Sequence, residues 1–280
     1  MEAALGGSSL GWVLVERGLG GGLGTFSYDR AGMGWSDAGP LPRSLPRLVE
    51  ELRQLLETVQ AAPPYILVGH SFGALVMRDF AANYPELTAG LVLVDPPSLE
   101  EWDHPDADHQ AKLERGILLA RRGSLAARLG IARLGAWLID AGALKLAAAC
   151  ATVVSGGKLR TRSDFNLAPA ALLPAELKPA LRWFWTRPRF YDALASQMEE
   201  LPAAVRAVMA APPLGDVPLV VLSAADTPAT QLAEHRGMAE QSKRGRHFQA
   251  ASSGHWIPLE DPELVIAAIR AVAAATAGVR

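Results

Sequence analysis

This 280-residue sequence contains little cysteine, little net charge and no long apolar run. Its one cysteine, Cys150, excludes a disulfide-stabilised scaffold and a zinc site built on cysteines. The 27 Lys and Arg residues against 29 Asp and Glu residues leave a net charge of −2, which does not suit a protein that must neutralise nucleic-acid phosphates. Apolar runs such as 146–154 fall far below the roughly 20 residues of a membrane-spanning helix, and we expect no signal peptide at the start. We therefore expect a cytoplasmic protein with a small-molecule partner, no nucleic-acid partner and no integral membrane segment.

Short β-rich runs alternate with helical patterns over much of the chain. Most of the runs are largely apolar, which suits strands that are buried on both faces of a parallel sheet. The alternation predicts an α/β fold. The predicted strands are Gly24–Tyr28, Tyr65–Val68, Leu91–Val94, Pro218–Ser223 and Arg246–Ala250. The predicted helices are Ser44–Gln60, Gly73–Asn83, Thr230–Gln241 and Pro262–Ala275, the last with Asp261 as its N-cap.

Residues 97–213 interrupt this alternation. The segment has a helical composition, contains no clear strand and is bracketed by the proline pairs Pro96-Pro97 and Pro212-Pro213. We interpret it as a helical insert in an α/β core formed by residues 1–96 and 214–280.

The most informative stretch is Gly69-His-Ser71-Phe-Gly73, which follows an apolar strand and leads directly into a helical pattern. Strand, Gly-x-Ser-x-Gly and helix together form the context of a nucleophile elbow, a tight turn that exposes the serine hydroxyl above the sheet. Ser71 is therefore the candidate nucleophile. The Phe72 N–H, at the start of the helix, is one candidate donor to an oxyanion.

A serine hydroxyl needs a base, and the base needs an orienting acid. His255 lies between the last predicted strand and the last helix and is the candidate base. Asp226 follows the strand before it and is the preferred acid, while Asp95, at the end of the preceding strand, is the alternative. Both aspartates come after strands, so both are expected at the carboxyl edge of the sheet.

With these residues the chain resembles the α/β-hydrolase superfamily, and specifically its cofactor-independent serine hydrolases with a helical cap. The resemblance extends over nearly the whole chain and also includes the stretch Tyr28-Asp-Arg-Ala-Gly-Met-Gly-Trp-Ser36. It implies a mostly parallel sheet flanked by helices, a catalytic triad, hydrolytic activity and a cap formed by the insert. In this family the second oxyanion donor comes from a loop that resembles Ala3–Ser9, so the Leu5 N–H is the second candidate donor.

The resemblance also implies strands ahead of that loop, for which only Met1–Ala4 is available. The amino-terminal strands are therefore expected to be missing, and we hypothesise that the sequence is truncated or begins at a start codon assigned too late. A longer precursor could carry a targeting segment, so the cytoplasmic expectation depends on this point.

We predict a serine esterase that acts on small to medium apolar carboxylic esters, with no cofactor and no metal. Trp183 and Trp185 in the insert and Trp256 beside the base are the candidate substrate contacts, because aromatic side chains favour apolar groups. Two alternatives use the same triad: a cofactor-free perhydrolase (haloperoxidase) and a carbon–carbon bond hydrolase. A third is a non-catalytic small-molecule receptor on the same fold. Assembly into a homo-oligomer is left open.

Overall fold

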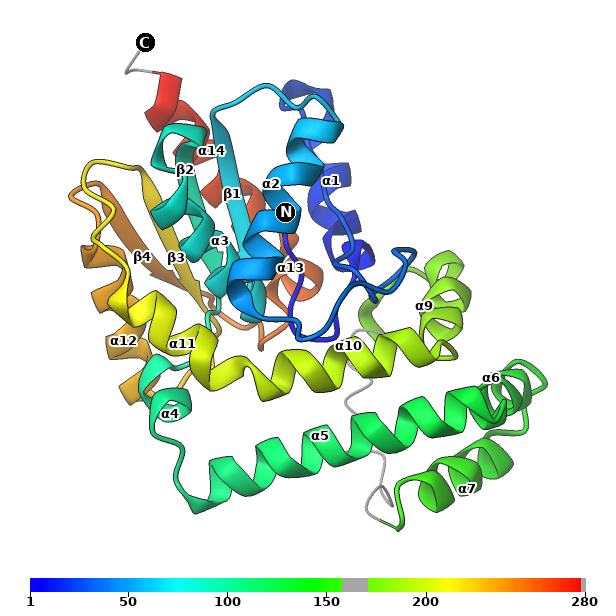
Figure 1. Cartoon of the computed structure of the whole chain (residues 1–280). Helices are drawn as coiled ribbons and strands as arrows, with labels where there is room; N and C mark the ends of the chain where they lie inside the picture. Colours follow the sequence, from blue (N-terminus) through cyan, green and yellow to red (C-terminus); the bar gives the residue numbers. More distant parts are fainter. Residues whose placement is uncertain (158–170, 278–280) are drawn as a thin grey trace. The chain divides into compact units, whose positions relative to one another are not determined.

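The computed structural model describes residues 1–157 and 171–277 (Figure 1). They form two compact units, one of residues 1–28, 44–105 and 200–277 and one of residues 29–43, 106–157 and 171–199. The first unit contains the sheet and the second is helical. The domain boundaries predicted from the sequence, 1–96 with 214–280 and 97–213, differ from these bounds and remain a prediction.

The sheet of the first unit has four parallel strands among the described residues, in the order β1-β2-β3-β4. Their apolar residues make β2 and β3 almost wholly buried, as expected for central strands of a parallel sheet. Four of the five predicted strands are thereby confirmed. The bounds are β1 Tyr65–His70, β2 Thr88–Val94, β3 Leu219–Ser223 and β4 Gly245–Gln249.

The predicted strand Gly24–Tyr28 is wrong, since the structure has no strand there. The segment lies beside the first residues of the chain, where the Met1 amine donates to Phe26 O and the Tyr28 hydroxyl donates to the Glu2 carboxylate. Glu2 forms a single parallel bridge with Gly69 of β1, using its own N–H and C=O groups on that side. Met1 and Glu2, the residues beside this segment, offer too few backbone groups for a ladder of hydrogen bonds. Gly24–Tyr28 therefore does not become a strand.

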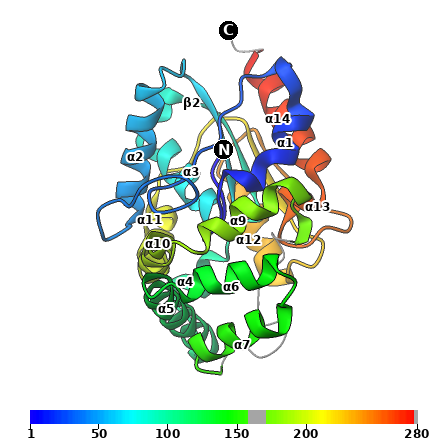
Figure 2. The same cartoon turned by 90° about the vertical axis from the view of Figure 1, so that its right-hand side faces the viewer.

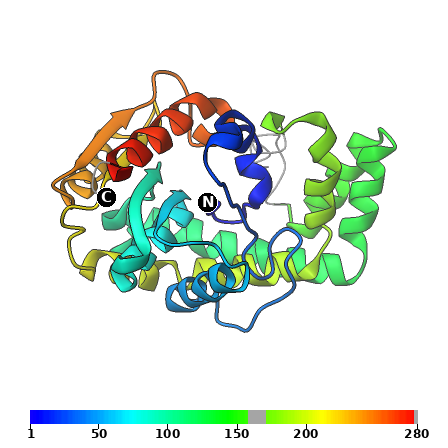
Figure 3. The same cartoon turned by 90° about the horizontal axis from the view of Figure 1, so that it is seen from above.

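Helices cover both faces of this sheet. Helices α2, α3 and α12 pack on one face, and α1, α13 and α14 on the other (Figures 2 and 3). All four predicted helices are confirmed, and the Asp261 carboxylate accepts the Leu264 N–H as the predicted N-cap of α14. The helices of this unit are α1 Val13–Leu19, α2 Leu45–Thr58, α3 Phe72–Asn83, α4 Leu99–Asp103, α11 Leu201–Ala210, α12 Ala229–Glu240, α13 Ile257–Glu260 and α14 Pro262–Ala277, with the 3-10 turns Ser9–Trp12, Gly20–Gly22 and Pro85–Leu87.

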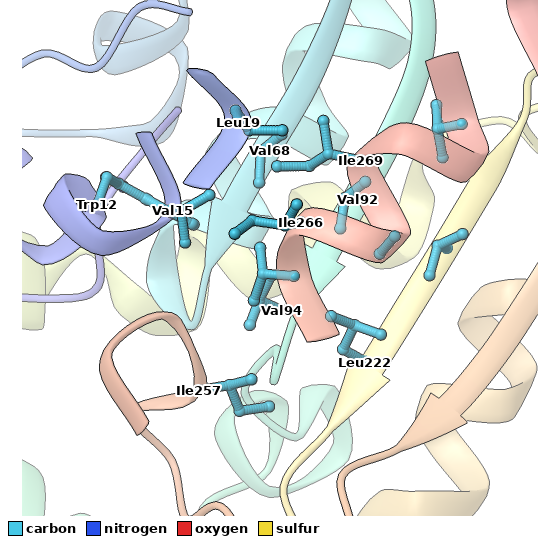
Figure 4. Close-up of a cluster of buried hydrophobic side chains, with 14 of the residues drawn as sticks. Trp12, Val15, Leu19, Val68, Val92, Val94, Leu222, Ile257, Ile266 and Ile269 are labelled. Atoms are coloured by element: carbon cyan, nitrogen blue, oxygen red, sulfur yellow. The ribbon is translucent and has the colours of Figure 1, made fainter. Parts of the chain in front are cut away.

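A continuous apolar core fills the space between the sheet and α1, α13 and α14 (Figure 4). Val15 from α1, Val92 from β2 and Ile266 from α14 meet there, each at most 1% exposed. Burial of this kind stabilises a domain by about 25 cal/mol for each Å² of apolar surface removed from water. The core therefore fixes β1 and β2, the two strands whose ends carry the candidate site.

The described residues of the second unit form helices and include the long loop 29–43. Helices α5 and α10 run antiparallel in close contact: the Ser124 hydroxyl donates to Asp192 Oδ1 at 2.6 Å, and Gly123 leaves room for the Tyr191 ring. The loop 29–43 joins this unit through Met33, which packs against Phe190 and Ala193. The helices are α5 Ala107–Arg128, α6 Ile131–Asp140, α7 Leu144–Val154, α9 Lys178–Phe184 and α10 Pro188–Glu199, with the 3-10 turn Ala175–Leu177. The predicted helical insert between two strands of the sheet is confirmed.

Candidate active site

Ser71 occupies the sharp turn between β1 and α3. Its backbone has φ +53° and ψ −120°, a conformation that side-chain-bearing residues rarely adopt. The turn is held by two backbone hydrogen bonds, from Ser71 N–H to Val94 O and from Ala74 N–H to Ser71 O, both 2.8 Å long. A strained serine between a buried strand and a helix N-terminus is the geometry of a nucleophile elbow.

The two glycines of the motif make this turn sterically feasible. A Cβ on Gly69 would lie 2.3 Å from Gly73 O, and a Cβ on Gly73 would lie 2.5 Å from Glu2 O and 2.7 Å from Ala3 O. All three distances are shorter than the closest approach of nonbonded atoms, and the atoms in the way belong to the backbone. The spacing Gly-x-Ser-x-Gly therefore allows the strand, the helix and the amino-terminal segment to meet behind Ser71.

His255 is paired with Asp95. The His255 Nδ1 lies 2.6 Å from Asp95 Oδ2, and the histidine side chain is 44% exposed while the aspartate is buried. Because an ionised carboxylate only accepts hydrogen bonds, Nδ1 carries the proton, and the other ring nitrogen, Nε2, is left as the basic atom.

Asp95 is held ionised in a buried position. Its Oδ1 accepts the Ala224 N–H at 3.0 Å and the Thr227 hydroxyl at 3.2 Å. Burial alone would raise the pKa of this carboxyl, but the hydrogen bond and charge of His255, with the Ala224 N–H, lower it below its ordinary value. Asp95 therefore presents a negative charge to His255 at neutral pH.

Asp226, the acid preferred in the sequence analysis, does not pair with His255 in this structure. Asp226 is exposed, and the loop that contains it folds so that Ala224 and Thr227 donate to Asp95 instead. The physical reason is register: Val94 pairs with His70, so Asp95 follows β2 at the level where Ser71 follows β1. Asp226 comes three residues after the end of β3 and has left the edge of the sheet. The alternative, Asp95, is the aspartate that contacts the histidine.

His70 is a second histidine at the site that sequence reasoning did not use. Its Nε2 lies 2.7 Å from the backbone oxygen of His255, and its ring contacts those of Trp12, His255 and Trp256. Burial first, and the neighbouring His255 second, lower the pKa of His70 to about 3. A neutral His70 therefore donates to the loop that carries the candidate base.

The two candidate oxyanion donors lie on segments that meet at the elbow. Phe72 is the first residue of α3, where the amides of the first turn point along the helix axis toward its N-terminus. Leu5 is a central residue of a turn closed by the bond from Gly7 N–H to Ala4 O, 2.9 Å long, with Gly6 at φ +67°. The Glu2–Ala3 backbone just before this turn packs against Gly73, so the Leu5 turn follows directly on the chain that contacts the elbow.

The three tryptophans predicted to contact substrate have different environments. Trp256 belongs to the first unit, with its ring edge-on to those of His70 and His255. Trp185 belongs to the second unit and packs on the Met33 cluster, while its backbone oxygen accepts the Tyr191 hydroxyl. Trp183 is 42% exposed, with the Arg187 guanidinium 4.8 Å from its ring centroid. All three remain predicted substrate contacts.

Within the described residues no group of three or more His, Cys, Asp or Glu side chains is arranged to hold a metal ion. In the stretch 103–109, the side chains of His104 and His109 are paired with Asp103 and Asp106, and Asp106 caps α5. No helix in the described ranges has the length and apolar character needed to cross a bilayer.

Comparison with known proteins links this geometry to one family. A family model described as the alpha/beta hydrolase fold matches residues 3–262. The uncharacterized protein YqjL of Bacillus subtilis is 37% identical over 95 residues, which cover 34% of this chain and 38% of YqjL. The chain thus spans well under half the length of the curated relatives it matches first.

Solved structures resemble the whole chain. An esterase from Thermogutta terrifontis gives a TM-score of 0.65 at 22% identity, covering 98% of this chain and 88% of the esterase. A loop variant of the haloalkane dehalogenase DbeA from Bradyrhizobium elkanii gives a TM-score of 0.65 at 19% identity, with 99% and 90% covered. At these identities the likeness concerns the fold alone.

Proposed function

Because the chain belongs to the alpha/beta hydrolase fold family, we propose that it is a serine hydrolase that cleaves carboxylic esters through an acyl-enzyme. The observation that carries the proposal is the combination of a strained Ser71 at the end of β1 with the 2.6 Å His255–Asp95 hydrogen bond, since the backbone oxygen of His255 is bonded to His70, the residue directly before Ser71. A strained serine alone would be a turn, and a histidine–aspartate pair alone would be a salt bridge. Together they supply a nucleophile, a base and an orienting acid.

In the proposed acylation, Ser71 Oγ attacks the carbonyl carbon of the ester while His255 Nε2 takes the hydroxyl proton. Asp95 keeps the opposite nitrogen protonated and stabilises the positive charge that forms on the ring. The C–O bond to the alcohol then breaks, and the same proton passes from Nε2 to the leaving alkoxide.

The negative charge of the tetrahedral intermediate requires hydrogen-bond donors that are already in place. We assign this role to the Phe72 N–H, supported by its position at the N-terminus of the 12-residue helix α3. The Leu5 N–H is the second proposed donor, supported by the contact of the chain before it with Gly73. In deacylation His255 Nε2 takes a proton from water, whose oxygen attacks the acyl carbon. The bond to Ser71 Oγ then breaks, the proton passes from Nε2 to Ser71 Oγ, and the acid is released.

We propose that the substrates are small to medium apolar esters. Trp256 supports this, because its ring lies next to the base and provides an apolar surface there. Trp183 and Trp185 are the proposed contacts from the helical insert, and substitution tests their contribution.

The test is intact-mass analysis after treatment with a fluorophosphonate, which requires only an activated serine and an oxyanion site. The expected result is one adduct on the wild type and none on Ser71→Ala, followed by turnover of a panel of p-nitrophenyl esters. Ser36→Ala is the matched control, because Ser36 donates to Asp29 O in the loop of the second unit and has no part in the proposed chemistry. A folded wild type that forms no adduct would favour the receptor alternative and contradict the proposed function.

A further inference from the structure

A series of hydrogen-bonded polar side chains, half-buried at its first member and buried beyond it, runs from β4 to the turn after β2, outside the proposed triad. Its members are His247 on β4, Ser223 at the end of β3 and His235 on α12, and it ends on the backbone oxygen of Pro96. The three hydrogen-bond distances are 2.8 Å from His247 Nε2 to Ser223 Oγ, 2.6 Å from Ser223 Oγ to His235 Nδ1 and 2.8 Å from His235 Nε2 to Pro96 O. Ser223 and His235 are completely buried.

The donor and acceptor of each hydrogen bond in this series follow from its last acceptor, the backbone oxygen of Pro96. A carbonyl oxygen only accepts, so His235 Nε2 must carry a proton and donate to Pro96 O. Burial lowers the pKa of His235, so its Nδ1 is unprotonated and accepts the Ser223 hydroxyl. The Ser223 oxygen then accepts from His247 Nε2. Only this arrangement gives a hydrogen-bond partner to each of the polar atoms in the series. It therefore fixes the tautomer of His235.

Ser223 and His235 also form a serine–histidine pair, but they are not a second nucleophile and base. The hydroxyl is fully buried, and the Nε2 atom that would have to exchange protons with a substrate is bonded to Pro96 O. The role of the pair is therefore structural, and it concerns the Pro96 backbone to which His235 is bonded.

That backbone is the turn that carries the proposed acid. Asp95 has φ +44°, a conformation that is strained for a residue with a side chain. The turn is held by the bond from Asp95 N–H to Leu222 O, 2.7 Å long, and by two side-chain donors to Pro96 O, His235 Nε2 and Gln231 Nε2 at 2.9 Å. Both side chains come from α12, so this helix determines where the peptide after Asp95 can lie.

We propose that His235 is a positioning residue for the hydrolase: by donating to Pro96 O it keeps the strained Asp95 turn in place, so that the carboxylate stays on His255 Nδ1. This inference rests on the proposed function, in which Asp95 is the triad acid. Ser223 and His247 contribute by holding His235 in the tautomer that donates. A displacement of about 1 Å at a catalytic group is enough to reduce a rate by up to roughly 100-fold.

The experiment compares His235→Phe, which keeps a ring but has no donor, with His235→Gln, which retains an N–H donor. Turnover of a p-nitrophenyl ester gives kcat and KM, and proton NMR follows the downfield resonance of His255 Nδ1–H, assigned by its loss in His255→Gln. We expect His235→Phe to lower kcat by about 10- to 100-fold with little change in KM. We also expect the downfield resonance of His235→Phe to be weakened or shifted upfield. In His235→Gln, both kcat and this resonance should be close to their wild-type values.

A matched control is His104→Phe, because the His104 side chain is 86% exposed. If folded His235→Phe retains the wild-type kcat and the wild-type resonance, the inference is overturned. If His235→Phe fails to fold, the downfield resonance is measured in His235→Gln and Ser223→Ala instead. A weakened resonance in Ser223→Ala, with a smaller change in His235→Gln, supports the inference. An unchanged resonance in Ser223→Ala overturns it.

The NMR readout needs no substrate, so it separates this inference from the proposed function. Failure of the wild type to react with a fluorophosphonate contradicts the hydrolase assignment, while the resonance still reports whether His235 positions Asp95.

Discussion

Ser71 and Asp95 occupy equivalent places on neighbouring strands. Each follows directly on a residue of the pair His70–Val94, and each has a positive φ, +53° for Ser71 and +44° for Asp95. The bond from Ser71 N–H to Val94 O ties the first turn to the second strand. Two strained residues at one level of a parallel sheet place the proposed nucleophile and the proposed acid at its carboxyl edge, where α/β proteins bind their ligands.

Replacement of each aspartate by asparagine tests which of the two acts as the triad acid. Asp95→Asn removes the charge that orients His255, and we expect kcat to fall by about 10⁴-fold, as for loss of the acid in other serine triads. Asp226→Asn is the matched control and should leave kcat within about twofold, because Asp226 is exposed and lies outside the pair. Steady-state kinetics on one ester measures both. A large loss in Asp226→Asn with none in Asp95→Asn would contradict the assignment of Asp95.

The close approach at Gly73 predicts a large steric penalty. In Gly73→Ala the new Cβ would collide with the backbone oxygens of Glu2 and Ala3, and overpacking of this kind destabilises a protein by about 1–3 kcal/mol. Gly237→Ala is the matched control: it lies within α12, its Cβ would meet nothing within 4 Å, and helix propensity favours alanine by about 1 kcal/mol. In urea denaturation, Gly73→Ala should therefore unfold at a lower midpoint than the wild type and Gly237→Ala at a higher one. Equal midpoints for the two variants would contradict the packing described at the elbow.

The buried His70 predicts how stability depends on pH. Its pKa is lowered from 6.5 to about 3, so between these values His70 is neutral in the folded protein and protonated in the unfolded chain. The unfolded state then binds more protons, and the free energy of unfolding decreases as the pH falls through this window, by up to about 1.4 kcal/mol per pH unit from this group.

We expect His70→Gln to have a flatter dependence than the wild type in denaturation curves measured from about pH 7 to pH 4. The glutamine amide retains a donor for His255 O, while the ionisable ring is gone. Parallel wild-type and His70→Gln profiles would show that His70 is not the buried neutral group described here.

Trp185 and Trp183, both in the second unit, should respond differently to replacement by alanine. Trp185→Ala should lower the melting temperature, because the half-buried ring packs on the Met33–Phe190 cluster. The loss should be smaller than the roughly 3–5 kcal/mol that truncation of a fully buried aromatic residue costs. Trp183→Ala should leave stability nearly unchanged, since the side chain is 42% exposed, and should raise KM for apolar esters if it contacts substrate. Thermal unfolding and ester kinetics on both variants measure this difference. An unaltered KM in Trp183→Ala removes Trp183 from the proposed substrate contacts.

Local patterns in the sequence were sufficient for most of the core. The short β-rich runs predicted β1 to β4, and the proline and acidic residues after Asp261 predicted the start of α14, because both signals depend on neighbours in the chain. The elbow was visible for the same reason: strand, glycine spacing and helix are contiguous around Ser71.

Features that depend on pairing between distant segments were harder to predict. The hydrogen bond of His255 to Asp95 rather than to Asp226 follows from the register of β1 against β2 and from the fold of the Ala224–Thr227 loop, neither of which a single strand pattern contains. A usable signal was present, since Asp95 directly follows the apolar run Leu91–Val94 while Asp226 comes three residues after the end of β3. The error at Gly24–Tyr28 has the same origin, because a β-rich run becomes a strand only where a partner offers enough backbone groups.

The composition of the second unit has a consequence for chimeric proteins. Loop 29–43 contributes Met33 to the cluster with Phe190 and Ala193, and the Arg43 N–H donates to the Ser196 hydroxyl at 2.9 Å. A recombinant that receives only the insert from a homologue would therefore combine an α10 from one parent with a loop from the other and mismatch this cluster. The smallest exchangeable module is the pair of segments 29–43 and 106–199, inherited together although more than 60 residues separate them in the sequence.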